Sequence, residues 1–259
     1  MEAAEHPYER VERELRGTAF ARIRYLRRTG STNEDAAALL GDSGAFGTSV
    51  VAEEQTHGAG RKGRSWIASP GSSLLVTTIL PRSIPASHLW VVPFGVAICV
   101  RRALHVSGIP SDLHWPNDLL TGGKKIAGIL CVSRIAGDEA WVGAGVGINV
   151  HRPADADASI APPPAFCDDV NPNVDRATLL RDVLLNYEVW SDQLEMPQRI
   201  ARVWERWAGL PKRYSILKDG ETEPIDVTAL GLSNNGGLIV QHDDGRRETI
   251  SLADARALR

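Results

Sequence analysis

The amino-acid sequence predicts an α+β fold, in which a mixed or antiparallel β-sheet with flanking helices precedes a small β-barrel. Short β-branched or apolar runs recur between residues 23 and 150 and predict strands, whereas longer apolar or Ala/Leu-rich stretches predict helices. Beyond residue 210, short strand-like runs are separated by turn residues. The length of 259 residues allows one large domain, or a medium domain and a small one.

The first predicted elements lead into a polar turn. Residues 8–15 predict a short charged helix, and residues 23–26 predict a strand. Ser31 and Glu34 have the spacing of a capping box, in which Ser31 caps a helix and the Glu34 side chain reaches back to the cap. The Ala/Leu-rich residues 35–40 predict the helix itself.

Four strands and one long helix are predicted in the middle of the chain. The strands cover residues 48–52, 73–80, 126–132 and 140–150, which are rich in β-branched residues or alternate small and apolar ones. Residues 89–106 form an apolar run that is too long for a strand, and we therefore predict a buried helix there.

A loop and two helices follow these strands. Residues 153–172 are rich in Ala, Pro and Asp, which is typical of a surface loop. Helices are predicted over residues 176–194 and 197–207, and the second has a Trp204/Trp207 face.

A domain boundary is predicted near Leu210, because the sequence Gly209-Leu210-Pro211 interrupts the helical pattern. The short runs after it are separated by Asp219-Gly220, Asn234-Asn235-Gly236-Gly237 and Asp243-Asp244-Gly245. The prediction therefore divides the chain into a larger domain, residues 1–210, and a β-barrel domain, residues 211–259.

Composition excludes several classes of protein. The formal net charge of -3 gives no general reason to expect a nucleic-acid partner. The three cysteines are an odd number without a C-x-x-C spacing, so neither a disulfide framework nor a cysteine-based zinc site is expected. A reducing, cytoplasmic location is the natural expectation.

No membrane or secretory segment is predicted. A membrane-spanning helix needs about 18 unbroken apolar residues. The longest apolar run, near residues 90–100, is interrupted by Pro93 and Gly95. Residues 1–17 carry acidic side chains and lack an apolar core, so they do not fit a signal peptide.

The most informative stretch is a glycine-rich loop that formally matches the G-x-G-x-x-G dinucleotide fingerprint at Gly58, Gly60 and Gly63. That fingerprint requires a helix directly after the glycines and an acidic residue about 20 positions later. Here residues 65–71 lead into a strand, and the position in question is Ser83. A dinucleotide site is therefore disfavoured.

The same loop is better interpreted as an anion-binding segment. Successive glycine-rich backbone amides can surround an anion, and Arg61 and Arg64 can bind phosphate or carboxylate with two hydrogen bonds each. Lys62 is expected to face solvent. The alternative is a solvated hairpin tip whose charges only increase solubility.

A second group of polar residues surrounds a Gly-Gly turn. Asp118 and Lys125 lie seven positions apart across that turn, which would let them meet at the mouth of a hairpin. A lysine at the start of an apolar strand is unusual unless its ammonium group reaches a site. Asn149 is similarly a polar residue in an apolar run, although both patterns also occur in ordinary packed strands.

Taken together, these segments resemble one family, the biotin–protein ligases, also called biotin–[acetyl-CoA-carboxylase] ligases. The matching motifs, in family order, are Gly30-Ser31-Thr32-Asn33, Glu54-Gln55, Gly58-x-Gly-Arg-x-Gly-Arg-x-Trp66, Trp115-Pro116-Asn117-Asp118, Lys125-Ile126-Ala127-Gly128-Ile129-Leu130 and Gly145-Val146-Gly147-Ile148-Asn149. The resemblance is close over about residues 20–150 and looser beyond. It implies a class II synthetase-like catalytic domain followed by an SH3-like barrel.

The resemblance also implies two half-reactions. Biotin and ATP-Mg²⁺ give biotinyl-5′-AMP and pyrophosphate, and the biotinyl group then passes to one lysine of a biotin carboxyl carrier domain. By resemblance, Lys125 bridges the biotin carboxylate and the α-phosphate, and Arg61 and Arg64 assist at the phosphates. Asp118 is the candidate to accept the proton of the incoming amine. No metal ligand set is expected on the protein itself.

The remaining site residues are also implied by the resemblance. The biotin-binding residues it implies are Ser31, Thr32, Asn33, Gln55, Ala59, Gly60, Arg61, Lys125 and Gly128. The nucleotide-binding residues are Arg61, Arg64, Trp66, Asn117, Lys125 and Asn149, with adenine packed against Trp66 once the loop orders. This chain departs from the family at Ala59, where an arginine is common, and at His114, where a lysine is usual. A histidine there would make one phosphate contact pH-dependent.

Two alternative functions stay open from the sequence. One is a related ligase that adenylates lipoate, octanoate or another carboxylate. The other is a biotin-binding transcriptional regulator, but only 29 residues precede Gly30, fewer than a winged helix-turn-helix needs. We therefore expect no DNA partner and no membrane partner, and a homodimer is compatible with the predicted sheet edges.

Overall fold

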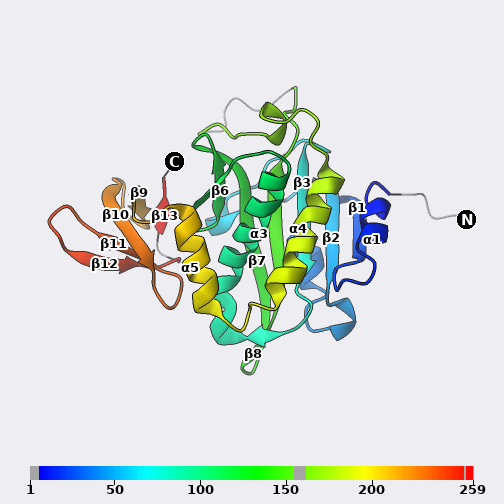
Figure 1. Ribbon diagram of the computed structural model, residues 1–259, viewed down its shortest axis with the longest axis horizontal. Helices are drawn as coiled ribbons and strands as arrows, with labels where there is room; N and C mark the ends of the chain where they lie inside the picture. The colour runs from blue at the N-terminus through cyan, green and yellow to red at the C-terminus, as the bar shows by residue number, and fades with distance from the viewer. Residues whose placement is uncertain (1–5, 155–161, 254, 259) are drawn as a thin grey trace, which may run out of the picture.

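The computed structural model describes residues 6–154, 162–253 and 255–258 (Figure 1). Part of the predicted loop over residues 153–172, namely residues 155–161, lies outside the described residues. The same is true of residues 1–5, 254 and 259 in the two predicted domains. The architecture is a large mixed sheet with helices on its faces and a second, smaller sheet beside it.

The large sheet has eight strands, in the order β1-β2-β3-β8-β7-β6-β5, with β4 paired to β8. The strands are β1 Arg22–Thr29, β2 Thr48–Gln55, β3 Ser73–Ile79, β4 Ile84–Pro85, β5 Asp112–His114, β6 Asp118–Thr121, β7 Lys124–Ala136 and β8 Glu139–Asn149. Strands β1 and β2 are parallel, and the other described pairs of this sheet are antiparallel. The predicted mixed sheet is therefore confirmed.

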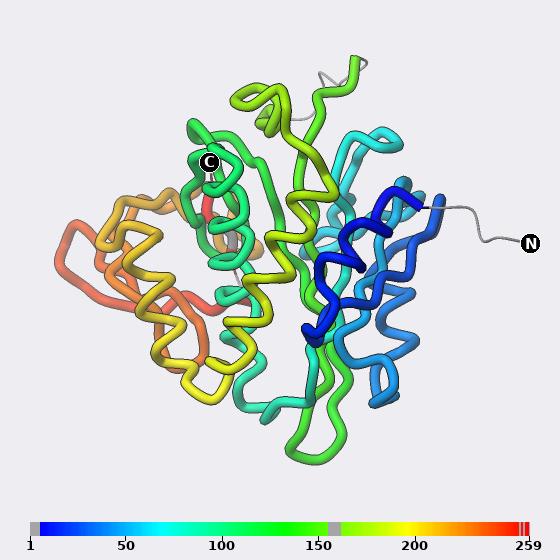
Figure 2. Tube along the Cα trace, turned by 45° about the vertical axis from the view of Figure 1, so that its right-hand side comes forward, coloured from blue at the N-terminus to red at the C-terminus, as the bar shows by residue number. Residues whose placement is uncertain are grey.

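Helices cover both faces of this sheet. The helices are α1 Glu9–Glu14, α2 Thr32–Ala37, α3 Val92–Val106, α4 Arg176–Ser191 and α5 Pro197–Ala208, with short 3₁₀ turns η1 Ser43–Ala45, η2 Arg61–Gly63, η3 Ala86–Val91 and η4 Cys167–Asp169. Figure 2 shows α3 and α4 side by side across one face. Successive residues of β2 point to opposite faces, so Val51 joins the core under α3 and α4, whereas Val50 joins a smaller cluster with Ala36 of α2.

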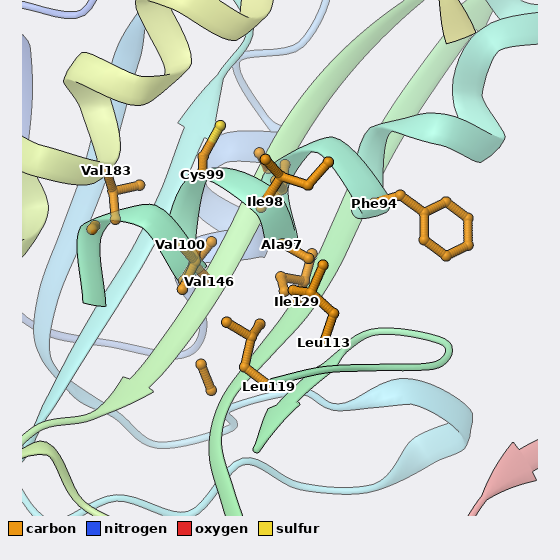
Figure 3. Close-up of a cluster of buried hydrophobic side chains, with 14 of the residues drawn as sticks. Phe94, Ala97, Ile98, Cys99, Val100, Leu113, Leu119, Ile129, Val146 and Val183 are labelled. Carbon is orange, nitrogen blue, oxygen red and sulfur yellow. The ribbon is translucent and has the colours of Figure 1, made fainter. Parts of the chain in front are cut away.

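The predicted apolar helix over residues 89–106 is the central helix of the core. Figure 3 shows Ala97 and Val100 of α3 close to Ile129 and Val146 of the sheet. Among the described residues, the 21-residue stretch Ala86–Val106 is long and apolar enough to cross a membrane by length and composition alone. Most of its apolar side chains are buried against the sheet and α4, and this burial accounts for its composition.

The second sheet has five antiparallel strands in the order β12-β11-β10-β9-β13. They are β9 Lys212–Lys218, β10 Ile225–Leu232, β11 Leu238–Gln241, β12 Arg247–Ile250 and β13 Ala255–Ala257. This sheet, called the C-terminal barrel below, packs on the larger part through Tyr214. The backbone N–H of Trp115 donates to the Tyr214 hydroxyl at 3.5 Å. A division of the chain at residue 210 stays a prediction.

Two local predictions were wrong. The helix predicted over residues 35–40 is α2, which begins at Thr32 and ends at Ala37. Ser31 occupies the N-cap position, but its side chain makes no capping hydrogen bond, and the residue lines the pocket described below. The short strands β4, β5 and β6 had no sequence signal of their own.

Candidate active site

A pocket of about 920 Å³ is lined by β2, β3, β7, β8 and the loop of residues 58–66. All predicted site residues except Asp118 line it, namely Ser31, Thr32, Asn33, Gln55, Ala59, Gly60, Arg61, Arg64, Trp66, Asn117, Lys125, Gly128 and Asn149. Asp118 is adjacent through its ion pair with Lys125. Segments that are far apart in the sequence therefore converge on one cavity.

One end of the pocket is a buried hydrogen-bond network around the start of α2. Gln55 Oε1 accepts from the Thr32 backbone N–H at 2.7 Å and from the Thr32 hydroxyl at 2.9 Å. Asn33 Oδ1 accepts from the Thr77 hydroxyl at 2.8 Å, and Asn33 Nδ2 donates to the Leu130 carbonyl at 3.1 Å. Asn33 therefore holds α2 to the sheet while it also lines the pocket, and its predicted contact with biotin stays a prediction.

Thr77 was missed by sequence reasoning, although it is a polar residue in the fully buried strand β3. Its hydroxyl lies 2.9 Å from the Thr32 hydroxyl, in addition to its contact with Asn33. Gly145 on the neighbouring strand is required by the same network. A Cβ at Gly145 would lie 2.2 Å from Asn33 Oδ1 and 2.4 Å from the Leu130 carbonyl oxygen.

The loop of residues 58–66 is folded as a small hairpin over the pocket. The Gly60 N–H donates to the Arg64 carbonyl at 2.6 Å, and the Trp66 N–H donates to the Gly58 carbonyl at 2.8 Å. Arg61 is half-buried and also donates from Nη2 to the Leu252 carbonyl of the C-terminal barrel. The loop thus presents its cations from a defined backbone, as an anion-binding segment requires.

The charges of the loop are close to one another. Burial, and next the neighbouring Arg64 charge, lower the pKa of Arg61 below its ordinary value, whereas Asp118 and Asp219 oppose that shift. Lys62 was expected to face solvent, and it is exposed. Its Nζ also lies 2.5 Å from Asp219 Oδ1 of the C-terminal barrel.

The Trp66 indole packs against glycines of β7 and β8. A Cβ at Gly147 would lie 2.7 Å from Trp66 Cε2, and a Cβ at Gly128 would lie 3.0 Å from Trp66 Cζ3. Only glycines therefore let the indole lie so close to β7 and β8. Lys125 Nζ is 5.4 Å from the centre of the Trp66 ring, a distance at which cation–π attraction acts.

Lys125 and Asp118 meet as the sequence predicted. The turn between β6 and β7 uses Gly122 and Gly123 at φ values of 57° and 77°, which glycine adopts without strain. Lys125 Nζ lies 2.6 Å from Asp118 Oδ1, with side-chain exposures of 18% and 11%. A nearly buried cation beside a carboxylate, at the wall of a cavity, is placed to bind an anionic group of a ligand.

Asn117 and Asn149 use their amide groups to hold the pocket wall. Asn117 Nδ2 donates to the Ile129 carbonyl at 2.7 Å. Asn149 Nδ2 lies 3.2 Å from the carbonyl oxygens of Lys125 and Ala165. These bonds leave the amide oxygens as the groups with remaining capacity to accept hydrogen bonds.

The sequence did not predict the pocket wall that contains Arg152 and Phe166. Arg152 lines the pocket and packs over the Phe166 ring at 4.5 Å, while its guanidinium donates to Asp169 Oδ1 at 2.9 Å and Oδ2 at 2.6 Å. The hydrogen bond from Arg152 lowers the pKa of Asp169 below its ordinary value. These residues flank an Ala/Pro/Asp-rich segment that carries no recognisable motif.

His114 does not line the pocket. It is buried with its ring 5.0 Å from that of Tyr214, at the contact with the C-terminal barrel. The pH-dependent phosphate contact expected at His114 stays a prediction.

Comparisons with known proteins show what this chain resembles. Residues 26–149 match the model of the biotin/lipoate A/B protein ligase family. The biotin–[acetyl-CoA-carboxylase] ligase of Paracoccus denitrificans is 29% identical over 235 residues, which is 86% of this chain and 95% of that protein. The bifunctional ligase/repressor BirA of Bacillus subtilis is 29% identical over 231 residues, which is 85% of this chain and 70% of that protein.

Solved structures share the fold. A biotin protein ligase from Aquifex aeolicus, determined in complex with biotin and ATP, has a TM-score of 0.73 and 24% identity, covering 92% of this chain and 99% of its own. A biotin protein ligase from Leishmania major, in complex with biotinyl-5-AMP, has a TM-score of 0.60 and 23% identity, covering 89% of this chain and 98% of its own. The predicted fold class is confirmed, and residues 26–149 resemble the biotin/lipoate A/B protein ligase family.

Proposed function

We propose that the protein is an ATP-dependent biotin–protein ligase. It would activate biotin as biotinyl-5′-AMP and transfer the biotinyl group to a lysine of a biotin carboxyl carrier domain. The observation that carries this proposal is the joining of three features in one cavity of about 920 Å³. These are a buried hydrogen-bonding end around Thr32 and Gln55, a cationic loop, and the Lys125–Asp118 pair.

The buried end suits the ureido ring of biotin. Ser31 and Thr32 are 2% and 4% exposed, so their hydroxyls would meet a ligand in a site with little water. A compact ring that both donates and accepts hydrogen bonds can join this network, whereas a purely apolar ring could form no hydrogen bond with it. Ala59, Gly60 and Gly128 line the path from this end to the loop.

Adenylation brings two anions together. The biotin carboxylate attacks the α-phosphorus of ATP, a C–O–P linkage forms, and pyrophosphate leaves with its bonding electrons. Lys125, Arg61 and Arg64 would neutralise the charge that develops. Lys125 pairs with Asp118, Arg61 donates to the Leu252 carbonyl, and Arg64 Nε donates to the Arg61 carbonyl at 3.2 Å. Trp66, Asn117 and Asn149 would hold the nucleotide.

Magnesium is proposed to enter with ATP. The described residues include no group of three or more His, Cys, Asp or Glu side chains that could hold a metal ion. Mg²⁺ is commonly bound through one or two carboxylates together with substrate phosphates, so a dedicated protein cage is not required. When bound, the ion would neutralise phosphate charge.

Transfer to the carrier requires a neutral amine. The amine nitrogen attacks the acyl carbon of the adenylate, AMP leaves, and the amine loses a proton. Asp118 is the proposed acceptor of that proton, because its carboxylate stands next to Lys125 at the pocket wall. The loop would shield the adenylate from hydrolysis meanwhile.

The test is mass spectrometry after incubating the protein with biotin, ATP-Mg²⁺ and a carrier domain. We expect one biotinyl adduct on the carrier and release of pyrophosphate. A preparation that binds biotin under no condition, with or without ATP, contradicts the proposal. Calorimetric titration with biotin and with lipoate separates the main alternative, since tighter lipoate binding would favour a lipoate ligase.

We further propose that the protein acts in the cytoplasm on a carrier domain, without binding DNA. A gel shift with operator DNA is expected to show no complex. Sedimentation measurements with and without biotin would report whether a homodimer forms.

A further inference from the structure

The loop of residues 58–66 is in contact with the C-terminal barrel at two points. Lys62 Nζ lies 2.5 Å from Asp219 Oδ1, in the turn between β9 and β10. Arg61 Nη2 donates to the Leu252 carbonyl, which follows β12. Two connecting segments of the C-terminal barrel therefore contact the loop that carries the pocket's cations.

We propose that Lys62 and Asp219 form a latch, through which the C-terminal barrel holds the 58–66 loop over the pocket and positions Arg61. Lys62 and Asp219 are positioning residues in this proposal and touch no substrate. The effect on catalysis rests on the proposed function, whereas the holding of the loop does not.

The backbone of Lys62 supports the latch. Its φ of 58° and ψ of 43° place it in the left-handed region, and it is the one non-glycine residue with positive φ among residues that the structure describes. Residues with a Cβ enter this region at a cost, and they stay there when surrounding contacts fix them. The ion pair with Asp219 supplies such a contact, and Gly63 continues the turn at a φ of 70°.

Arg61 connects the Lys62–Asp219 latch to the pocket. Arg61 lines the main pocket, and together with Leu252 it also lines a second cavity of about 310 Å³. Its guanidinium is thus placed between the pocket and the barrel. Because Lys62 is its direct neighbour, release of Lys62 from Asp219 would also free Arg61 to leave the pocket wall.

The expected size of the effect is modest. Lys62 and Asp219 are 27% and 57% exposed, and a pair so placed shifts an equilibrium about two- to five-fold. A nucleotide that binds the closed loop would lose apparent affinity in proportion to the lost closed population, whereas the rate at saturation would stay the same. The latch therefore predicts a raised KM for ATP with an unchanged kcat.

Hydrogen exchange of the loop tests the latch directly. The Gly60 and Trp66 amides are hydrogen-bonded inside the loop, so opening exposes them to exchange. In Lys62→Gln and in Asp219→Asn, exchange across residues 58–66 should accelerate about two- to five-fold. The double variant Lys62→Asp with Asp219→Lys should restore slow exchange. High salt should loosen the wild-type loop in the same direction.

A matched control lies elsewhere on the barrel. Arg213 and Asp243 form an exposed pair at 2.6 Å that does not involve the loop, so Arg213→Gln should change neither exchange nor kinetics. Unchanged exchange in both latch variants overturns the latch, and accelerated exchange with an unchanged KM for ATP overturns the positioning of Arg61. If the wild type transfers no biotin, the proposed function fails, and the exchange measurements still decide whether the latch exists.

Discussion

The two ends of the pocket hold their polar groups in different ways. At the sheet-built end, around Thr32, Asn33 and Gln55, groups are buried and bonded to one another or to neighbouring strands. At the loop-built end, residues 58–66, the cations are held by contacts within the loop and by the barrel. The first end is fixed by the core, and the second depends on a few partly exposed contacts.

This difference matches the demands of the proposed reaction. A site that selects one ring by hydrogen bonds benefits from groups that cannot relax, because a wrong ligand then leaves buried groups without partners. A site that must admit a nucleotide and then exclude water benefits from a loop that opens and closes at low cost. Substitutions at the two ends should therefore fail in different ways.

The largest expected effect is at the junction of the two ends. Lys125→Ala removes the cation that lies 2.6 Å from Asp118, and we expect adenylation to fall by at least about 10²–10³-fold. Pyrophosphate release in the presence of biotin and ATP measures this. Activity close to that of the wild type would remove Lys125 from the mechanism.

Gly145→Ala should damage the sheet-built end and the whole fold with it. The new Cβ would overlap Asn33 Oδ1 at 2.2 Å and the Leu130 carbonyl at 2.4 Å. The Leu130 carbonyl belongs to the packed sheet, and the Asn33 side chain is held by its hydrogen bonds with Leu130 and Thr77. We expect a loss of about 1–3 kcal/mol in the free energy of unfolding, together with weaker biotin binding. Urea denaturation and calorimetry test this, and an unaltered unfolding midpoint would show that the network relaxes easily.

Gly58→Ala is the matched change at the loop-built end. Its Cβ would lie 2.5 Å from the Trp66 carbonyl oxygen, but the loop is able to shift away. The free energy of unfolding should therefore change by less than about 0.5 kcal/mol, while the apparent affinity for ATP falls. A large loss of stability would mean that the loop is as firmly built as the sheet, and the comparison would fail.

Sequence reasoning succeeded where contacts are local or follow strand patterns. The Gly-Gly turn and the apolar strand after it were enough to bring Asp118 and Lys125 together. It did not reveal contacts with distant segments, such as the ion pair of Lys62 with Asp219 in the turn between β9 and β10. His114 likewise packs on Tyr214, a contact that depends on how the barrel is seated. Such contacts are set by tertiary packing and leave no periodic trace in the sequence.

The smallest expected effect concerns the wall made by Arg152, Phe166 and Asp169. The hydrogen bond from Arg152 holds the pKa of Asp169 below its ordinary value, although burial opposes this shift. A depressed pKa means that the pair stabilises the folded state above the unfolded Asp pKa of about 3.9 and stops doing so as the pH falls through the folded value. Because Asp169 is 36% exposed, the contribution is only about 0.5 kcal/mol.

The free energies of unfolding of the wild type and of Asp169→Asn, measured by urea denaturation, should differ by this amount at pH 7 and converge toward pH 3. A difference that persists at pH 3 would mean that Asp169 acts through packing instead of charge.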